Sequence, residues 1–496
     1  MESSGRISNQ RQFAKSGFLG AVTALSFAPF NVFPIFLATF AWLFVRICEG
    51  GNAKEWLLQP FCFFCCLHIG CLYWLVYPLT LDLAVHGILI PFAILLIPIY
   101  LSMFLLLPIC GLRMLSNWFR KSARLSFYRL LPVAFATFFT LTMMFYGNYL
   151  PGFPWVLPGY VWCCHEIFLQ TLCLYGIYGL SFSTLLMAGL LGDAFLLYVA
   201  LPARRRGKAA AWGPVLIAFV IFAAITLFGY WRLARNPTIY TDKRVRIIQS
   251  NISQEQKNDS AFAYSNLKKL LRLSAHSKKV DLVIWPEASV PYLYNEDFTR
   301  LHNYLKIPLL ADEYLLAGAV RKDLQTGKIF NSVIFIDHTG KHVAHYDKAR
   351  LTPFGEYIPL RKYFPLFQSI ASDIGDFNVG SESNLIEIGG IKILLAICYE
   401  VIFPGKLGLF SSPDFSKTDI IVNITNDGWF GFTSEPAQHL QISRARAIEA
   451  GVPLIRVANV GVSAVFDPCG RELSTVPFGQ DGVIEMSIPR SLHLPY

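Results

Sequence analysis

Long apolar stretches dominate the first half of the chain and are separated by short polar or basic loops. They cover residues 17–30, 32–48, 57–78, 84–111, 131–149, 166–201 and 212–231. A helix needs about 20 apolar residues to cross the hydrocarbon core of a bilayer, and about 17 at the low end. The pattern therefore predicts that residues 1–232 form a membrane bundle of about seven transmembrane helices.

The first apolar stretch is short and allows a second interpretation. Arg6, Arg11 and Lys15 precede it, just as basic residues precede the apolar core of a cleaved signal peptide. However, no cleavage site with small residues follows, and the second apolar stretch begins at once. A tilted helix, or half of a helical hairpin, is therefore favoured over a signal peptide.

From about residue 233 the pattern changes to short β-rich runs that alternate with turns and polar helical stretches. Strands are expected at 245–248, 281–285, 314–319, 332–336, 391–397, 420–424, 453–457 and 463–466, and helices at 261–277 and 437–450. Several of these strands are continuous apolar runs, which is typical of strands buried on both faces. Residues 233–496 are therefore expected to form an α/β domain with layered sheets.

The composition supports a membrane protein. Hydrophobic residues make up 54% of the chain and charged residues only 15%. Soluble globular proteins carry about 25% charged residues, so disorder and an ordinary cytosolic enzyme are disfavoured. The net charge of +10 falls almost wholly in the first 232 residues. Because no nucleic-acid-binding motif accompanies it, we expect no nucleic-acid partner and assign the excess to loops between helices.

Basic residues lie in alternate loops of the apolar half. They precede the first stretch and recur at about 46–54, 113–129 and 204–208, whereas the loops near Thr80 and at 148–162 contain no Lys or Arg. Positively charged loops stay in the cytoplasm, so the N-terminus is expected inside the cell. Seven crossings would then place residues 233–496 on the opposite side of the membrane.

Other polar residues of the apolar half indicate no separate site. The 11 cysteines of the chain include Cys62, Cys65 and Cys66, which have no companion pair at zinc spacing, so no metal is predicted there. Three acidic residues lie near the ends of apolar stretches, where contact with water is a simpler explanation than an ion pathway. They are Asp82, Glu166 and Asp193.

Reactive side chains follow the ends of predicted strands in the second half. Glu287 ends the run D-L-V-I-W-P-E, and Cys398 follows the strand in I-L-L-A-I-C-Y-E, with Glu400 two residues later. Between them, the segment Y-D-K-A-R-L-T-P-F-G-E-Y-I-P supplies Lys348 and Glu356. Sites in layered α/β folds gather at strand ends and in the loops beyond them, so these side chains are candidates for one site.

A set of Glu, Lys and Cys can perform acyl transfer without histidine. A thiol with its ordinary pKa of about 8.5 is mostly protonated near neutral pH. A nearby carboxylate can remove this proton, and a nearby ammonium can favour the thiolate and then stabilise an oxyanion. We therefore predict acyl transfer through a thioester. Taken singly, each residue would also suit a structural role, as a core cysteine, a turn cap or a surface lysine.

Other catalytic and metal-binding sets are less well supported. Cys398, His439 and Asn459 stand in the order of a papain-like site, but their spacing is short and the local signature of that family is missing. His342 and His345 would lie one turn apart only in a helix, whereas their segment is predicted as strand and loop. No metal and no cofactor are therefore predicted.

Five strings of the sequence, taken in order, carry a family resemblance. They are I-I-Q-S-N-I at 247–252, L-T-P-F-G-E-Y-I-P at 351–359, I-C-Y-E at 397–400, N-D-G-W-F-G at 426–431 and A-R-A-I-E-A-G-V-P-L-I-R at 445–456. Together with W-P-E at 285–287 and the Lys348 segment, they resemble the apolipoprotein N-acyltransferase branch of the nitrilase, or carbon–nitrogen hydrolase, superfamily. The resemblance covers nearly the whole chain and implies a nitrilase-like α-β-β-α sandwich after the membrane bundle.

The resemblance also implies a role for each candidate residue. Glu287 would be the general base, Cys398 the nucleophile and Lys348 the stabiliser of the tetrahedral intermediate. Glu356 would be a second acidic residue that orients the lysine. The remaining candidates would support the nucleophile or lie near the substrate entrance, namely Tyr399 and Glu400 for the first role and Trp429 and Phe430 for the second. Trp429 and Phe430 would equally suit the core.

The implied reaction has two half-steps. Cys398 takes an acyl chain, at the sn-1 position, from a phospholipid such as phosphatidylethanolamine, and a lysophospholipid leaves. The α-amine of the N-terminal diacylglyceryl-cysteine of an apolipoprotein then accepts the acyl chain as an amide. The expected partners are therefore a phospholipid donor, the apolipoprotein acceptor and the lipid bilayer. A monomeric multi-pass protein of the bacterial cytoplasmic (inner) membrane is expected, with its catalytic domain facing the periplasm.

Two further expectations concern the loop beside the site and the end of the chain. The segment 352–380 is rich in aromatic residues among Pro and Gly, which favours a mobile lid toward lipid over an ordinary packed loop. Its aromatic residues are Phe354, Tyr357, Tyr363, Phe364, Phe367 and Phe377. Members of the family usually continue with another membrane helix, whereas this sequence reaches Tyr496 without a further apolar run. Either that helix has been truncated from this sequence or this member of the family lacks it.

Two other functions remain compatible with the sequence. A membrane-tethered amidase or hydrolase of the same superfamily would use water as its second acceptor. A transporter or scaffold with an inactive domain would not need Cys398 at all, although no inverted pair of broken helices is evident.

Overall fold

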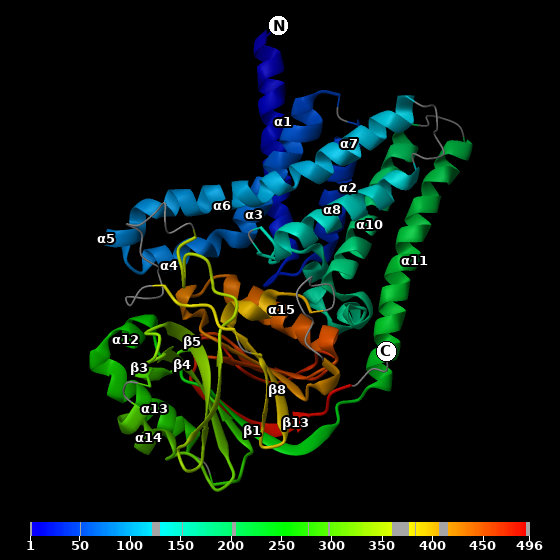
Figure 1. Cartoon of the computed structure of the whole chain (residues 1–496). Helices are drawn as coiled ribbons and strands as arrows, with labels where there is room; N and C mark the ends of the chain where they lie inside the picture. Colours follow the sequence, from blue (N-terminus) through cyan, green and yellow to red (C-terminus); the bar gives the residue numbers. More distant parts are fainter. Residues whose placement is uncertain are drawn as a thin grey trace. The chain divides into compact units, whose positions relative to one another are not determined.

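The chain divides into two compact units, of which the first ends at Arg235 and the second begins at Asn236. The computed structural model describes residues 2–49, 51–121, 129–150, 152–200, 205–275, 277–295, 298–359, 376–381, 383–405 and 415–492. Figure 1 shows the first unit as a set of helices and the second as sheets flanked by helices. Tyr363, Phe364 and Phe367 of the predicted lid, and Arg124 and Arg204 of the basic loops, lie outside the described residues.

The first unit is built of helices. The longer ones are α1 (Glu2–Thr23), α2 (Phe33–Glu49), α3 (Gln59–Leu72), α6 (Ile90–Phe104), α7 (Leu106–Lys121), α8 (Leu131–Asn148), α10 (Leu172–Ala200) and α11 (Arg205–Arg235). Shorter helices lie between them, namely α4 (Tyr77–Thr80), α5 (Leu83–His86) and α9 (Glu166–Leu169). Each of the predicted apolar stretches therefore contains helix.

Four helical spans among the described residues are long and apolar enough to cross a membrane. They are Lys54–Thr80, Gly87–Arg120, Leu172–Val199 and Ala211–Arg235. These spans overlap four of the predicted stretches, and the other three stretches overlap α1, α2 and α8. The chain is therefore a membrane protein, and the number of seven crossings stays a prediction.

Small residues let helices of the first unit approach closely. A Cβ atom added to Gly20 of α1 would lie 2.1 Å from the carbonyl oxygen of Phe63 in α3. A Cβ atom added to Gly192 of α10 would lie 2.8 Å from the carbonyl oxygen of Ala41 in α2. Lipid tails are as apolar as the helices, so association in a membrane depends on such close packing.

Two sheets form the centre of the second unit. The first sheet has the order β13-β1-β2-β4-β5-β6, with β3 paired to β4, and the second has the order β12-β11-β10-β9-β8-β7. The strands of the first are β1 (Tyr240–Gln249), β2 (Leu282–Ile284), β3 (Val290–Tyr294), β4 (Tyr314–Lys322), β5 (Ile329–Asp337), β6 (His342–Asp347) and β13 (Gly482–Pro489). Those of the second are β7 (Leu385–Ile388), β8 (Ile391–Ile397), β9 (Ile420–Thr425), β10 (Leu454–Ala458), β11 (Ser463–Phe466) and β12 (Glu472–Val476).

The two sheets pack face to face and helices cover their outer faces. Side chains of both sheets share one buried core, in which Ile247 and Ile284 meet Ile393 and Ile424. A second core joins the other face of the first sheet to α13 (Ala263–Ser274) and α14 (Phe298–Leu305). On the second sheet α15 (Glu435–Ala450) packs against β10. The predicted α-β-β-α sandwich is therefore confirmed.

Gly318 in the middle of β4 allows this strand to pass close to the turn that carries Glu287. The amide of Ser289 donates to the carbonyl oxygen of Gly318 over 2.8 Å. A Cβ atom at position 318 would lie 2.4 Å from the carbonyl oxygen of Pro286 and 2.7 Å from Cα of Glu287. Because these atoms belong to the backbone, they cannot move aside as a side chain could.

The substitution Gly318→Ala is therefore expected to displace the Glu287 turn and to destabilise the second unit by about 1–3 kcal/mol, the usual cost of overpacking. Gly355→Ala is the matched control, since its added Cβ atom would make an ordinary contact of 3.4 Å with the side chain of Thr352. Thermal unfolding of the two variants in detergent provides the comparison. Equal stability of both variants and the unmodified protein would contradict this account of Gly318.

Candidate active site

Cys398 lies at the point where β8 ends and a short 3-10 helix, η8 (Cys398–Ile402), begins. Its φ angle is +49°, in the left-handed region that side chains other than glycine rarely adopt. The amide of Asn423 in the parallel neighbour β9 donates to the carbonyl oxygens of Ala396, over 3.0 Å, and of Cys398, over 3.4 Å. Strained backbone of this kind concentrates at functional sites, and here Asn423 helps to hold it.

Glu287 lies in the turn between β2 and β3, next to Ala288, whose φ angle of +45° is also left-handed. Asn331 of β5 fixes its carboxylate, because Nδ2 donates to Glu287 Oε1 over 2.8 Å. The same Nδ2 donates to Glu356 Oε1 over 2.7 Å. One buried amide thus positions both carboxylates.

Lys348 directly follows β6 and is almost fully buried, with 1% of its side chain exposed. Its Nζ lies 2.8 Å from Glu356 Oε2 and 3.9 Å from Glu287 Oε1. Burial alone would lower the pKa of Lys348, but the charges of Glu356 and Glu287 outweigh it and raise the pKa above the ordinary value. Lys348 is therefore a buried cation held between two carboxylates.

Besides Asn331 and Lys348, the chain segment that contains Glu356 also fixes its carboxylate. The amide of Thr352 donates to Glu356 Oε2 over 2.8 Å, and the amide of Glu356 donates to the carbonyl oxygen of Thr352. The left-handed φ angle of Phe354, +63°, closes this tight loop. The loop sequence thus folds so that its glutamate faces Lys348.

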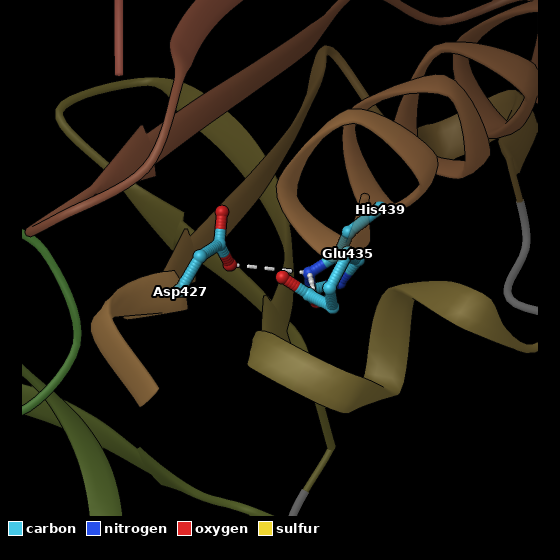
Figure 2. Close-up of side chains that lie close together, drawn as sticks. All are labelled: Asp427, Glu435 and His439. Carbon is cyan, nitrogen blue, oxygen red and sulfur yellow. Dashed lines mark hydrogen bonds and ion pairs between the residues drawn. The ribbon is translucent and has the colours of Figure 1, made fainter. Parts of the chain in front are cut away.

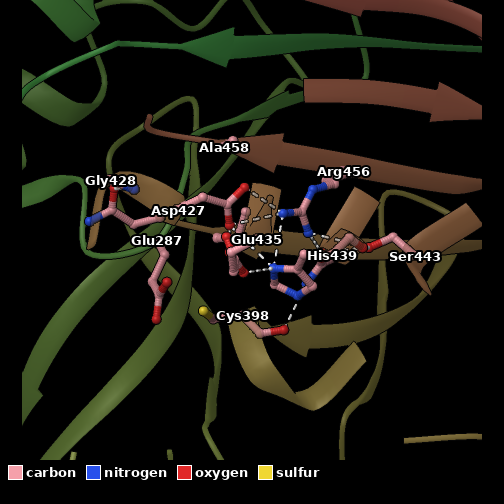
Figure 3. A network of polar contacts seen from close by, with 12 residues as sticks. Glu287, Cys398, Asp427, Gly428, Glu435, His439, Ser443, Arg456 and Ala458 are labelled. Atoms are coloured by element: carbon pink, nitrogen blue, oxygen red, sulfur yellow. Dashed lines mark hydrogen bonds and ion pairs between the residues drawn. The ribbon is translucent and has the colours of Figure 1, made fainter. Parts of the chain in front are cut away.

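The charges around Cys398 keep its thiol protonated at rest. Burial and then the negative charge of Glu287 raise the pKa of the thiol well above its ordinary value. The charge of Lys348 and a hydrogen bond with Thr425 act in the opposite direction without reversing it. Figure 3 shows the sulfur of Cys398 beside Glu287. The carboxylate is thus placed to take the thiol proton when the sulfur attacks a substrate.

Glu400 is a brace between the Cys398 turn and the Lys348 segment. Its carboxylate accepts hydrogen bonds from the amides of Ile397 (2.8 Å), Ala349 (2.8 Å) and Arg350 (3.0 Å), and from the hydroxyl of Tyr346 (2.8 Å). Four donors therefore bind the two oxygens of Glu400, and this arrangement fits a residue that supports the turn of the nucleophile.

The three predicted aromatic residues near the site differ in their burial. Tyr399 is 9% exposed, and its ring meets Phe403 edge-on with the ring centres 5.2 Å apart. Trp429 and Phe430 follow β9, where Trp429 ends the short 3-10 helix η10 (Asp427–Trp429). Both side chains are partly exposed rather than buried in the core. Their place at a substrate entrance stays a prediction.

Three polar residues of the site were not predicted from the sequence. Asn331 and Asn423 each interrupt an apolar strand, and a single polar residue in a buried strand is the signal that could have indicated them. Lys257 in α12 (Gln254–Asn258) donates from Nζ to the carbonyl oxygen of Glu287 over 3.0 Å. Nothing in its local sequence distinguishes it from a surface lysine.

A buried ionic cluster lies behind Cys398 and contains side chains of the types that bind metals. Atoms of Asp427, Glu435 and His439 lie within 4.8 Å of one another, as Figure 2 shows. However, Arg456 Nη2 lies 2.7 and 2.9 Å from the two oxygens of Asp427 and 3.1 Å from His439 Nδ1. The guanidinium thus occupies the position of the cation, and the cluster is an ion-pair network (Figure 3).

The cluster is also electrostatically coupled. Burial, and then the charge of Asp427, raise the pKa of Glu435 to about 7. Burial and the charge of Arg456 oppose protonation of His439, but its hydrogen bonds to Asp427 and Glu435 raise its pKa. These contacts are short, since His439 Nδ1 lies 3.3 Å from Asp427 Oδ1 and 3.2 Å from Glu435 Oε1.

Neither rival set of the sequence analysis forms a site in this arrangement. Asn459, the third member of the papain-like alternative, donates to the carbonyl oxygen of Ile252 and to Asn426 Oδ1. His342 and His345 lie on β6 and stack with their ring centres 5.4 Å apart, on a strand rather than on one face of a helix.

Comparison with known proteins covers both units. Residues 244–493 match the family model of carbon-nitrogen hydrolases, and residues 19–190 match the model of the apolipoprotein N-acyltransferase N-terminal domain. The chain is 32% identical to an apolipoprotein N-acyltransferase of Bradyrhizobium diazoefficiens, with 95% of this chain and 88% of the relative covered. It is 33% identical to that of Rhodopseudomonas palustris, over 95% and 88%, and 32% identical to that of Rickettsia prowazekii, over 96% and 92%.

The predicted resemblance is thus confirmed over nearly the full length of the chain. The chain therefore belongs to the apolipoprotein N-acyltransferase family.

Proposed function

We propose that this membrane enzyme transfers an acyl chain from a phospholipid, through a thioester on Cys398, to the N-terminal diacylglyceryl-cysteine of an apolipoprotein. The main support for this proposal is that Glu287, Lys348 and Cys398 lie close together at strand ends. It occurs in a chain whose relatives along its whole length are named apolipoprotein N-acyltransferases.

In the first half-reaction Glu287 takes the proton of the Cys398 thiol while the sulfur attacks the carbonyl carbon of the phospholipid ester. The electron pair of the carbonyl moves onto oxygen, and Lys348 stabilises this oxyanion. Collapse breaks the ester bond. The leaving alkoxide takes the proton back from Glu287 and departs as lysophospholipid, so that the acyl chain remains on sulfur as a thioester.

In the second half-reaction the acceptor amine is the nucleophile and the sulfur of Cys398 is the leaving group. The neutral α-amine of the acceptor cysteine attacks the thioester carbonyl, and Glu287 takes a proton from the nitrogen as the bond forms. Collapse of the second oxyanion expels the sulfur of Cys398, which takes the proton from Glu287. An amide is formed and the free enzyme is restored.

Glu356 acts on this chemistry through Lys348. The contact of 2.8 Å between Glu356 Oε2 and Lys348 Nζ keeps the ammonium charged and fixed. A stabilising charge that is already in place when the oxyanion forms costs no reorganisation during the reaction. We assign Glu356 to this positioning, and Tyr399 and Glu400 to support of the Cys398 turn.

The proposal also concerns location. Four apolar helical spans support a membrane protein. The basic loops of the sequence support a cytoplasmic N-terminus and a periplasmic catalytic unit in a bacterial inner membrane. Lipids reach such an enzyme from the bilayer, and lipoproteins with an exposed N-terminus meet it on the outer side.

The first test is chemical trapping of the acyl-enzyme. Incubation with phosphatidylethanolamine that carries a labelled acyl chain is expected to add the mass of that acyl chain to the peptide containing Cys398. Hydroxylamine should remove the adduct, since it cleaves thioesters. Cys398→Ala should form no adduct, whereas Cys164→Ala, which changes an exposed cysteine of the first unit, should form it normally. N-acylation of a diacylated peptide by Cys398→Ala at the unmodified rate would overturn the proposal.

The same experiment separates transfer from hydrolysis. After the adduct has formed, a diacylglyceryl peptide with a free α-amine is added without further phospholipid. Label that moves to the peptide supports the acyltransferase. Label released only as free fatty acid would support the membrane-tethered hydrolase instead.

A second prediction concerns the general base. Glu287→Gln keeps the shape and the contact with Asn331 but cannot take a proton, so thioester formation is expected to slow about 10²–10⁴-fold. Glu472→Gln, at an exposed position of β12, is the control and should leave the rate unchanged. The rate of adduct formation by mass spectrometry measures both. Thioester formation by Glu287→Gln at the unmodified rate would reject its role as base.

A third prediction concerns topology. Alkaline phosphatase fused after residue 235 is expected to be active, because this enzyme folds only outside the cytoplasm. A fusion after residue 124, in a basic loop, is expected to be inactive. The reverse pattern would place the catalytic unit in the cytoplasm.

A further inference from the structure

Lys257 is a second lysine beside the candidate nucleophile and base. Its Nζ donates to the main-chain carbonyl oxygen of Glu287 over 3.0 Å, from a side chain that is partly buried. It interacts electrostatically with the carboxylate of Glu287 and with Cys398. Lys257 thus contacts the turn that includes Ala288, with its left-handed φ angle of +45°.

A set of side-chain amides holds the segment that carries Lys257. Asn426 Nδ2 donates to Gln254 Oε1 over 2.8 Å, which ties α12 to the loop after β9. Asn459 Nδ2 donates to the carbonyl oxygen of Ile252 over 2.8 Å and to Asn426 Oδ1 over 3.0 Å. The position of Lys257 is therefore set by contacts from two neighbouring strand ends and not by α12 alone.

Among Glu287, Glu356, Lys348 and Lys257, two negative charges are matched by two positive charges. Glu287 and Glu356 contribute two negative charges and Lys348 contributes one positive charge. Lys257 contributes the second positive charge. When the thiol proton of Cys398 moves to Glu287, the negative charge moves to sulfur and then to the substrate oxygen, so the total is unchanged. Without Lys257 this set would carry a net negative charge, which disfavours the thiolate and the oxyanion.

Two further carboxylates near Cys398, those of Asp427 and Glu400, have other partners than Lys257. Asp427 is paired with Arg456, with Nη2 2.7 Å from Oδ2. Glu400 is surrounded by three amides and the hydroxyl of Tyr346.

We propose that Lys257 is a positioning residue of the acyl-transfer reaction. Its ammonium fixes the backbone turn that presents Glu287 and adds a second positive charge beside Lys348 while negative charge develops on sulfur and oxygen. This inference rests on the function proposed above and adds a second cation to the set of Glu287, Lys348 and Cys398.

The protonation of Lys257 makes the proposal accessible to a pH titration. Burial lowers the pKa of Lys257 to about 8, although the charges of Glu287 and Cys398 oppose this lowering. These are the titratable groups that act on it from the β2–β3 turn and from η8. Lys257 is therefore charged below about pH 8 and loses its charge as the pH rises through that value. An arginine at the same position would stay charged throughout this range.

The experiment measures the rate of thioester formation on Cys398 in the full-length protein, with labelled phosphatidylethanolamine in detergent micelles. Lys257→Met removes the charge at similar length and is expected to lower the rate at pH 7 at least about tenfold, because a group that acts through the turn costs less than the roughly 10²–10³-fold of a direct oxyanion donor. Lys257→Arg is expected to restore most of the rate. Lys279→Met is the control, because Lys279 forms an exposed ion pair with Asp312 and should show the unmodified rate.

The ratio of the Lys257→Arg rate to the unmodified rate should increase between pH 7 and pH 9.5, because only the unmodified enzyme loses the charge. A merely structural role would leave this ratio constant. Lys257→Met at the unmodified rate, or a constant ratio, would overturn the proposal. If Lys257→Met fails to fold, the ratio alone decides. Absence of a thioester in the unmodified protein would instead contradict the proposed function itself.

Discussion

Lys348 is a positive charge in a place where water is almost absent, and the site depends on how that charge is compensated. An ammonium removed from water without a partner is expensive, so burial alone would favour the neutral amine. Glu356 at 2.8 Å and Glu287 at 3.9 Å reverse this preference. Asn331 holds both carboxylates with one amide group, so the charge, its two counter-charges and their spacing form a single unit.

The chemistry of Cys398 follows from this unit. Burial, and then the charge of Glu287, raise the pKa of the thiol, so at rest the sulfur is neutral and the carboxylate is free to act as base. A cation is already fixed where a negative charge must develop. The backbone contributes through the left-handed conformation of Cys398, which Asn423 and the Glu400 brace help to hold. Gly318 contributes by leaving room for the Glu287 turn.

The sequence predicted those parts that follow from local pattern. The eight predicted strands correspond to β1, β2, β4, β5, β8, β9, β10 and β11, because buried strands read as apolar runs. Strands β3, β7, β12 and β13 were missed, and the segment of β6 was predicted only as strand and loop. β12 and β7 show why, since their mixture of exposed and buried positions resembles a loop. Glu287, Lys348 and Cys398 were recognised at strand ends, whereas Lys257 acquires its place only through long-range contacts with Glu287.

The central claim is that the charge of Lys348 makes Cys398 reactive, and the most direct measurement is the rate at which iodoacetamide alkylates this cysteine without any lipid. The rate is compared between the unmodified protein and Lys348→Met, from pH 6 to pH 9, with peptide mass spectrometry of Cys398. The account predicts slower alkylation of the variant over the whole range, because the thiolate loses its stabilising charge. Equal or faster alkylation of Lys348→Met would contradict it.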